Sequence, residues 1–153
     1  VRNNGLEFLL EVIPSKVGPV SDATNAEIIN RFYQLGVFPD WWKLEPMRSK
    51  AAWTAACDAI SSNDPHVRGI VILGLDAPET ELAESFAIAA SYPLVKGFAV
   101  GRTIFADVAR QWFGSALTDQ EAIEEMARRY DRLCRLWDEA RRASGQATVI
   151  NEN

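Results

Sequence analysis

The feature that most constrains the fold of this sequence is a regular alternation of four short apolar runs with longer helical patterns. The runs are rich in β-branched or aromatic residues and are bounded by Gly, Pro or Asp, which is typical of β-strands. They cover Leu6–Ile13, Asp40–Pro46, Gly69–Asp76 and Val95–Arg102. The third run is almost continuously apolar, as expected of a parallel strand that is covered on both faces.

A helical pattern fills each gap between these runs. Apolar residues at helical spacing predict helices over Ala23–Leu35, over Met47–Ser61, and from Pro78 to the stop at Pro93. A chain that alternates strands with helices in this way forms a parallel sheet with right-handed crossovers.

Two more helices are predicted after the fourth strand. The first covers Thr103–Phe113 and the second opens at Thr118 and runs to about Ala143. The Thr118 hydroxyl can cap the second helix while Glu121 reaches back to it, which is the pattern of a capping box.

The number of βα units in the sequence is half of the number in a (β/α)₈ barrel. A full (β/α)₈ barrel takes about 250 residues, and this chain has 153 residues with four βα units. We therefore predict an α/β fold that is the C-terminal half of a TIM-type barrel plus a long C-terminal helix. Residues 1–145 would form one domain and residues 146–153 a frayed tail. The start at Val1, directly before an apolar run, predicts a fragment of a larger barrel.

Composition narrows the function classes. The formal net charge of −5 argues against a general nucleic-acid-binding protein, which needs a basic face. No run approaches the roughly 20 apolar residues of a membrane span, and no signal-peptide pattern is present. Cys57 and Cys134 lie in helical patterns without a CxxC motif, so we expect two free thiols and a cytoplasmic setting.

Polar residues stand at the carboxyl end of each predicted strand, where parallel α/β folds place their reactive groups. In chain order they are Glu11, Lys43 with Glu45, Asp76, and Gly101 with Arg102.

Lys43 is the most informative of these residues. Alternation along a strand puts Trp41, Lys43 and Glu45 on one face. An amine held in an apolar barrel mouth loses hydration, which favours the neutral form that attacks a carbonyl. The alternative, equally compatible with the spacing, is an outward lysine paired with Glu45.

The carboxylates are open to two interpretations. Glu11 would act as a proton shuttle one strand away from Lys43, or, as spacing alone somewhat favours, as its ion-pair partner. Glu45 would pair with Lys43 or Arg48, or would be a second acid in the site. Asp76 precedes Ala-Pro at a helix start, which favours an N-cap over a ligand contact.

The segment Gly101-Arg102-Thr103 predicts a phosphate site. Glycine allows close approach of the backbone, the following helix offers N–H groups and a positive dipole end, and Arg102 adds a charged donor. His66 is the only histidine and precedes the third strand, at the opposite rim, so no histidine-held metal is expected.

Four segments together carry a resemblance to a known family: EVIPSK, FPDWWKLEP, GIVILGLDAP and VKGFAVGRTIF. They resemble the domain found C-terminal to the sugar kinase in bacterial 5-dehydro-2-deoxygluconokinase proteins of myo-inositol catabolism. That domain is similar to the class I tagatose-bisphosphate-type aldolases, which are (β/α)₈ barrels. The likeness covers about Leu6 to Arg142 and would make these strands five to eight of the barrel.

The resemblance implies roles for individual residues. It implies that Lys43 forms the Schiff base, that Glu11 is the acid/base residue, and that Gly101 and Arg102, with Gly74–Asp76, hold the phosphate. The implied substrate is 2-deoxy-5-keto-gluconate 6-phosphate, cleaved to dihydroxyacetone phosphate and malonate semialdehyde without a metal or cofactor. The implied partners are the N-terminal half-barrel and the sugar kinase, or a second copy of the chain, because half a barrel exposes two strand edges.

Two other functions remain open on the sequence. A metal-assisted lyase would use Glu11, Glu45 and Asp76 as Mg²⁺ ligands on three successive strands. A regulatory or scaffolding domain would sense a sugar phosphate for an attached kinase without chemistry of its own.

Overall fold

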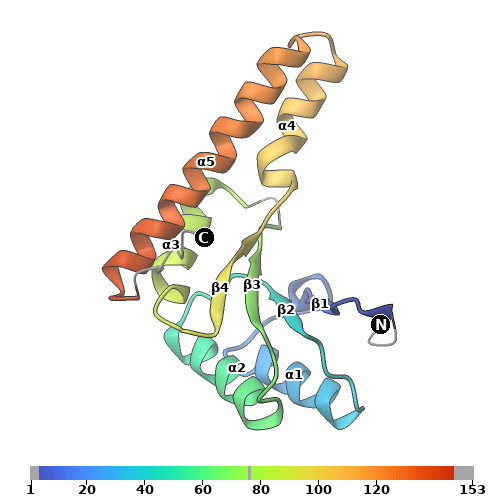
Figure 1. The fold of residues 1–153 in the computed structure, drawn as a ribbon, viewed down its shortest axis with the longest axis vertical. Coiled ribbons are helices and arrows are strands. Elements are labelled where there is room, and N and C mark those ends of the chain that lie inside the picture. The colour runs from blue at the N-terminus through green and yellow to red at the C-terminus, as the bar shows by residue number, and fades with distance from the viewer. Residues whose placement is uncertain (1–3, 76, 147–153) are drawn as a thin grey trace.

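A four-stranded parallel sheet organises the chain (Figure 1). The computed structural model describes residues 4–75 and 77–146. The strands stand in the order β1-β2-β3-β4. Their bounds are Leu9–Val12 (β1), Trp41–Leu44 (β2), Gly69–Leu73 (β3) and Val95–Ala99 (β4). Each strand lies within a predicted run and ends before the run does.

Helices follow each strand, as predicted, and a long helix closes the described chain. Their bounds are Thr24–Gln34 (α1), Lys50–Asn63 (α2), Glu79–Ala89 (α3), Arg102–Phe113 (α4) and Asp119–Ala143 (α5). A 3-10 turn over Pro14–Lys16 (η2) was not predicted. The mixed α/β class, the parallel alternation and the long C-terminal helix are therefore confirmed.

The core lies on one face of the sheet. Register places Leu10, Trp42 and Ile70 side by side on adjacent strands, and Trp42 and Ile70 are fully buried. Helices α1, α2, α3 and α5 pack on this face. They contribute Ile29, Trp53, Phe86 and Trp137, in that order, to the same apolar cluster. Large aromatic side chains bury the most apolar surface per residue, so these side chains contribute strongly to the stability of this layer.

The second face of the sheet is more open to solvent. Leu9 is exposed there, and Trp41, Val71 and Gly97 are only half-buried. Strict alternation along the strands sends Glu11 and Lys43 to this same face. The sheet thus has one sealed apolar face and one face that is partly open to solvent.

Helices α4 and α5 form an antiparallel hairpin that extends beyond the sheet (Figure 1). The predicted capping box is confirmed at the start of α5, where the Glu121 amide donates to the Thr118 hydroxyl and the Thr118 amide donates to the Glu121 carboxylate. Arg129 on α5 joins the two helices, because it contacts Glu125 at 2.6 Å and Asp107 of α4 at 3.3 Å.

Both free thiols expected from the sequence are confirmed, and each is half-buried. Burial, with Asp58 nearby, raises the pKa of Cys57 to about 11, which favours the protonated thiol at neutral pH. No helix within residues 4–75 and 77–146 is long and apolar enough to cross a membrane.

The ion pairs of the hairpin predict a loss of α4–α5 contact in acid. Hydrogen bonds from Arg110 and Arg129 lower the pKa of Asp107 below its ordinary 3.8, and those from Arg129 and Arg128 lower the pKa of Glu125 below 4.5. A lowered carboxyl pKa contributes stability above the unfolded value and loses it as the pH falls through the folded value. Amide hydrogen exchange should therefore show α4 opening more readily below about pH 4, while α2 stays protected.

The matched variant is Arg129→Met, which removes the shared cation and keeps an unbranched apolar stem. It should open α4 at pH 7 and weaken, but not abolish, the pH dependence of the α4 protection factors, because Arg110 and Arg128 still lower the pKa values of Asp107 and Glu125. Equal protection of α4 in the variant and the parent at pH 7 would contradict this role of Arg129.

Candidate functional site

A cleft of about 330 Å³ lies at the carboxyl ends of the strands. Its wall comes from β1, β2, the loop after β3, the end of β4 and the first turn of α4. Five of the residues predicted to form a site line it, namely Glu11, Lys43, Gly74, Gly101 and Arg102. The structure therefore brings together residues that are up to 91 positions apart in the sequence, from Glu11 to Arg102.

An ion pair between neighbouring strands is the centre of this cleft. Glu11 of β1 is paired in register with Lys43 of β2, and the Lys43 Nζ lies 2.9 Å from the Glu11 Oε1. The Lys43 side chain is 23% exposed and that of Glu11 43%. The amine is thus partly withdrawn from water but still open to the cleft, and it contacts a carboxylate directly.

The opposite side of the cleft is the N-terminus of α4. Gly101 is the N-cap residue, and its carbonyl accepts from the amides of Ile104 (2.8 Å) and Phe105 (3.1 Å). Arg102 and Thr103 begin the helix, whose first turn holds no acidic residue. The positive dipole end and Arg102 therefore make this wall favourable to an anion.

Close packing fixes the wall between β3 and α4. A Cβ on Gly74 would lie 2.8 Å from the Val100 Cγ1 and 3.0 Å from the Thr103 Oγ1, so only glycine fits there without a shift. The next residue, Leu75, has φ of +48°, in the left-handed region that costs a non-glycine residue free energy. Such strain is held by surrounding packing and is common at functional sites.

Glu45 does not join this cleft, and the prediction that it shares a face with Lys43 at the site is wrong. β2 ends at Leu44, so strict alternation stops before Glu45. Its buried carboxylate accepts hydrogen bonds from the Ser15 hydroxyl and, at 3.3 Å, from the Ser15 amide. The suggested ion pairs of Glu45 with Lys43 and Arg48 are also wrong, because Lys43 pairs with Glu11, and Arg48 with Glu81 at 3.7 Å.

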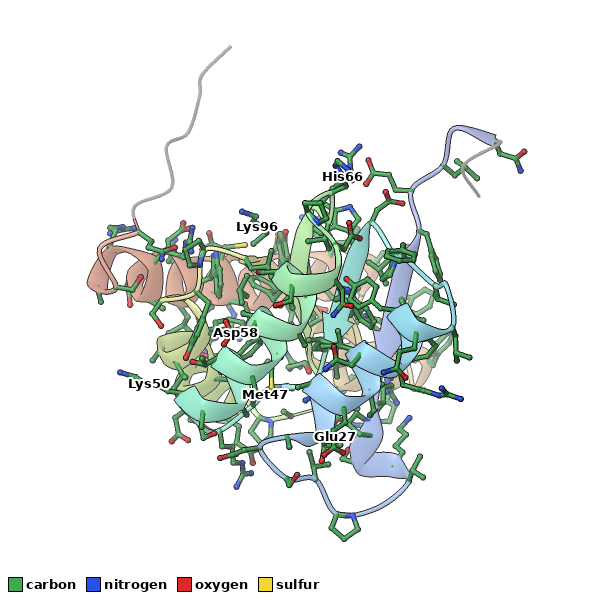
Figure 2. The ribbon with its side chains drawn as sticks, turned by 90° about the horizontal axis from the view of Figure 1, so that it is seen from below. Glu27, Met47, Lys50, Asp58, His66 and Lys96 are labelled. Atoms are coloured by element: carbon green, nitrogen blue, oxygen red, sulfur yellow. The ribbon has the colours of Figure 1, made fainter. Side chains whose placement is uncertain are left out.

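Two further expectations concern the loop after β3 and the histidine. Asp76 lies outside the described residues, and Pro78 is the N-cap residue of α3. His66 lies at the amino end of the strands, at the opposite end of the sheet from Met47 (Figure 2). Within the described chain, no three or more His, Cys, Asp and Glu side chains are grouped as metal ligands.

Lys16 and Phe105 also line the cleft and were not predicted from the sequence. Lys16 reaches it because η2 turns the chain back over the end of β1. The proline of the Pro-Ser-Lys segment favours such a tight turn and was the available signal for it. With Lys16, the described lining carries three basic side chains and one acidic one.

Comparison with known protein families assigns the chain to one of them. The family described as "Uncharacterized protein conserved in bacteria (DUF2090)" matches residues 1–141. The chain belongs to the DUF2090 family. The match contains all four strands and every residue that lines the Lys43 cleft. No curated protein matches the chain.

The packing around Gly74 gives a stability prediction for this DUF2090 chain. Gly74→Ala should destabilise the fold by about 1–3 kcal/mol, because the added Cβ overpacks the contact with Val100 and Thr103. Gly97→Ala is the matched control, since nothing lies within 4 Å of its Cβ position. That control should change stability by less than about 1 kcal/mol. Urea denaturation measures both, and equal effects of the two substitutions would contradict the packing argument.

Proposed function

We propose that this chain is part of a class I aldolase, a cytoplasmic lyase that cleaves a phosphorylated keto sugar acid through a Schiff base on Lys43. The observation that carries the proposal is the Lys43–Glu11 contact of 2.9 Å, in a cleft that also holds Arg102 and the start of α4. The substrate is 2-deoxy-5-keto-gluconate 6-phosphate of myo-inositol catabolism, as the family resemblance implies. The two free thiols fit a reducing compartment.

The chemistry needs an amine and a proton carrier in contact. Glu11 takes a proton from the Lys43 ammonium, and the neutral Nζ attacks the C5 ketone of the substrate. Water leaves with a proton returned by Glu11, giving a protonated imine. Glu11 then accepts the proton of the C3 hydroxyl, the C3–C4 bond breaks, and its electron pair moves toward the imine nitrogen. Malonate semialdehyde leaves first, Glu11 gives the proton it took from the C3 hydroxyl to C4 of the resulting enamine, and hydrolysis of the imine so formed releases dihydroxyacetone phosphate.

The charge of the cleft supports an anionic substrate. Its described lining carries Lys16, Lys43 and Arg102 against Glu11. In this proposal the phosphate binds at the N-terminus of α4, beside Arg102 and Gly101, where backbone N–H groups and the helix dipole favour negative charge. Gly74 forms the neighbouring wall, and its lack of a side chain keeps that wall close to α4.

The open face of the sheet supports a half-barrel. Four parallel strands in sequential order, with helices over one face and an exposed second face, fit one half of a (β/α)₈ barrel. In the proposal, the N-terminal half-barrel of the parent protein, which also carries the sugar kinase, covers this face and completes the substrate contacts. A homo-oligomer that pairs two such faces is the alternative cover.

The geometry favours the imine over a magnesium site. A magnesium lyase needs Glu11, Glu45 and Asp76 around one ion. Glu11 lies against Lys43, whereas Glu45 is bound to Ser15 and lines a different cleft. A sensor without catalysis would use the same anion-binding wall and would not need the Lys43–Glu11 pair.

Borohydride trapping tests the proposal directly. The protein is incubated with dihydroxyacetone phosphate and sodium borohydride, and peptides are examined by mass spectrometry. We expect a reduced adduct on Lys43, its loss in Lys43→Met, and an unchanged adduct yield in Lys50→Met, which alters an exposed lysine. Glu11→Gln should lower the rate of aldol cleavage by about 10²–10⁴-fold, the usual contribution of acid–base catalysis.

The other outcomes separate the alternatives. Cleavage that persists in Lys43→Met but stops with a chelator would contradict the imine and favour the carboxylate site. Phosphate binding that survives in Lys43→Met, with no aldol cleavage by the parent protein, would contradict catalysis and favour the sensor.

A further inference from the structure

A second cleft, of about 920 Å³, lies at the same end of the sheet but between the helices. Its lining comes from the loops after β1, β2 and β3 and from α1, α2 and α3. Three polar side chains of this lining are almost fully buried, with exposed fractions of 6% for Glu45, 2% for Asn25 and 5% for Ser85. The cleft is thus distinct from the one that holds Lys43.

Two of these buried groups have no protein partner. Neither the Asn25 Oδ1 nor the Ser85 Oγ forms a hydrogen bond within the described structure. A buried polar atom without a partner costs roughly 1–3 kcal/mol of folding free energy. Alanine or leucine would avoid this cost at both positions. The polar atoms of Asn25 and Ser85 therefore indicate that these two residues bind a ligand.

The charge of the cleft defines the kind of ligand. Its described lining holds the carboxylates of Asp22, Glu45, Glu81 and Glu84 and a single cation, Arg48. Arg48 is 91% exposed and lies 3.7 Å from Glu81, so it leaves the buried part of the cleft acidic. An anion is therefore disfavoured here, and a ligand that donates hydrogen bonds and carries positive charge is favoured.

The size of the cleft selects an organic ligand over a metal ion. Volumes of about 300–1,000 Å³ are typical of small-molecule sites. The described part of the chain has no group of three or more potential metal ligands. Apolar side chains, including Met47 and Ile88, line the same space and suit a carbon skeleton.

We propose that this second cleft binds a small organic cation through its ammonium group. In this proposal the three hydrogens of a primary ammonium are donated to three acceptors of the lining, the Glu45 carboxylate, the Asn25 Oδ1 and the Ser85 Oγ. The carbon chain of the ligand lies against Met47 and Ile88. This site is independent of the proposed aldolase chemistry, although Gly74 and Leu75 line both clefts.

The test compares two probes of nearly equal shape, 1,4-diaminobutane and 1,4-butanediol, by NMR titration of the isotope-labelled protein at pH 7. We expect saturable shifts at Asn25 and Ser85 with the diamine and none with the diol. Glu45→Gln should weaken diamine binding by about tenfold or more, since it removes a charge-assisted hydrogen bond. Glu139→Gln makes the same change on an exposed part of α5 and should leave binding unchanged.

Ser85→Ala separates a ligand contact from a structural role. If the hydroxyl serves a ligand, the variant should bind the diamine more weakly while its melting temperature stays equal or rises. A lower melting temperature would show that the hydroxyl is bonded in the folded protein and would overturn the proposal. Three other results would also overturn the proposal. They are equal shifts with the diamine and the diol, equal effects of the two Glu→Gln variants, and no saturable binding of the diamine.

Discussion

The contact between Glu11 and Lys43 is the interaction on which the rest of this account depends. It exists because β1 and β2 are parallel and paired in register, which sets the two residues opposite each other. The same alternation that buries Trp42 under the helices turns Lys43 to the open face of the sheet. A shift of one residue in register would reverse both faces, so the apolar core and the ion pair are specified together.

The two clefts share a wall that is unusually constrained. Gly74 is packed against Val100 and Thr103, and Leu75 holds a left-handed backbone conformation. Both residues line the Lys43 cleft and the acidic cleft between the helices. A ligand in either cleft thus contacts the same short segment of backbone. Sites that depend on such strained segments trade some stability for fixed geometry.

Much of the fold was predictable from the sequence, and the reasons are local. Apolar runs and helical periodicity located all four strands and the helices, and the Thr118 capping box marked the start of α5. The convergence of Lys43, Glu11 and Arg102 followed from the rule that parallel strands present their carboxyl ends at one edge. These features depend on residue spacing, which the sequence contains in full.

What could not be predicted depends on contacts between distant segments. The predicted second strand extended past the true end of β2, so Glu45 was assigned to the wrong cleft. Its hydrogen-bond partner, Ser15, is 30 positions away in the sequence. Asn25 and Ser85 lie within ordinary helical patterns, where a polar residue normally faces solvent, and only tertiary packing buries them. Their lack of partners could be recognised only in the folded structure.

The central claim is that the Lys43 amine lies in an anion-binding cleft, and competitive acetylation of the lysines tests it most directly. The rate of modification of each lysine is followed by mass spectrometry with and without inorganic phosphate, with the exposed Lys50 as internal reference. Phosphate should slow the modification of Lys43 and leave that of Lys50 unchanged. Equal rates at Lys43 with and without phosphate would contradict the claim.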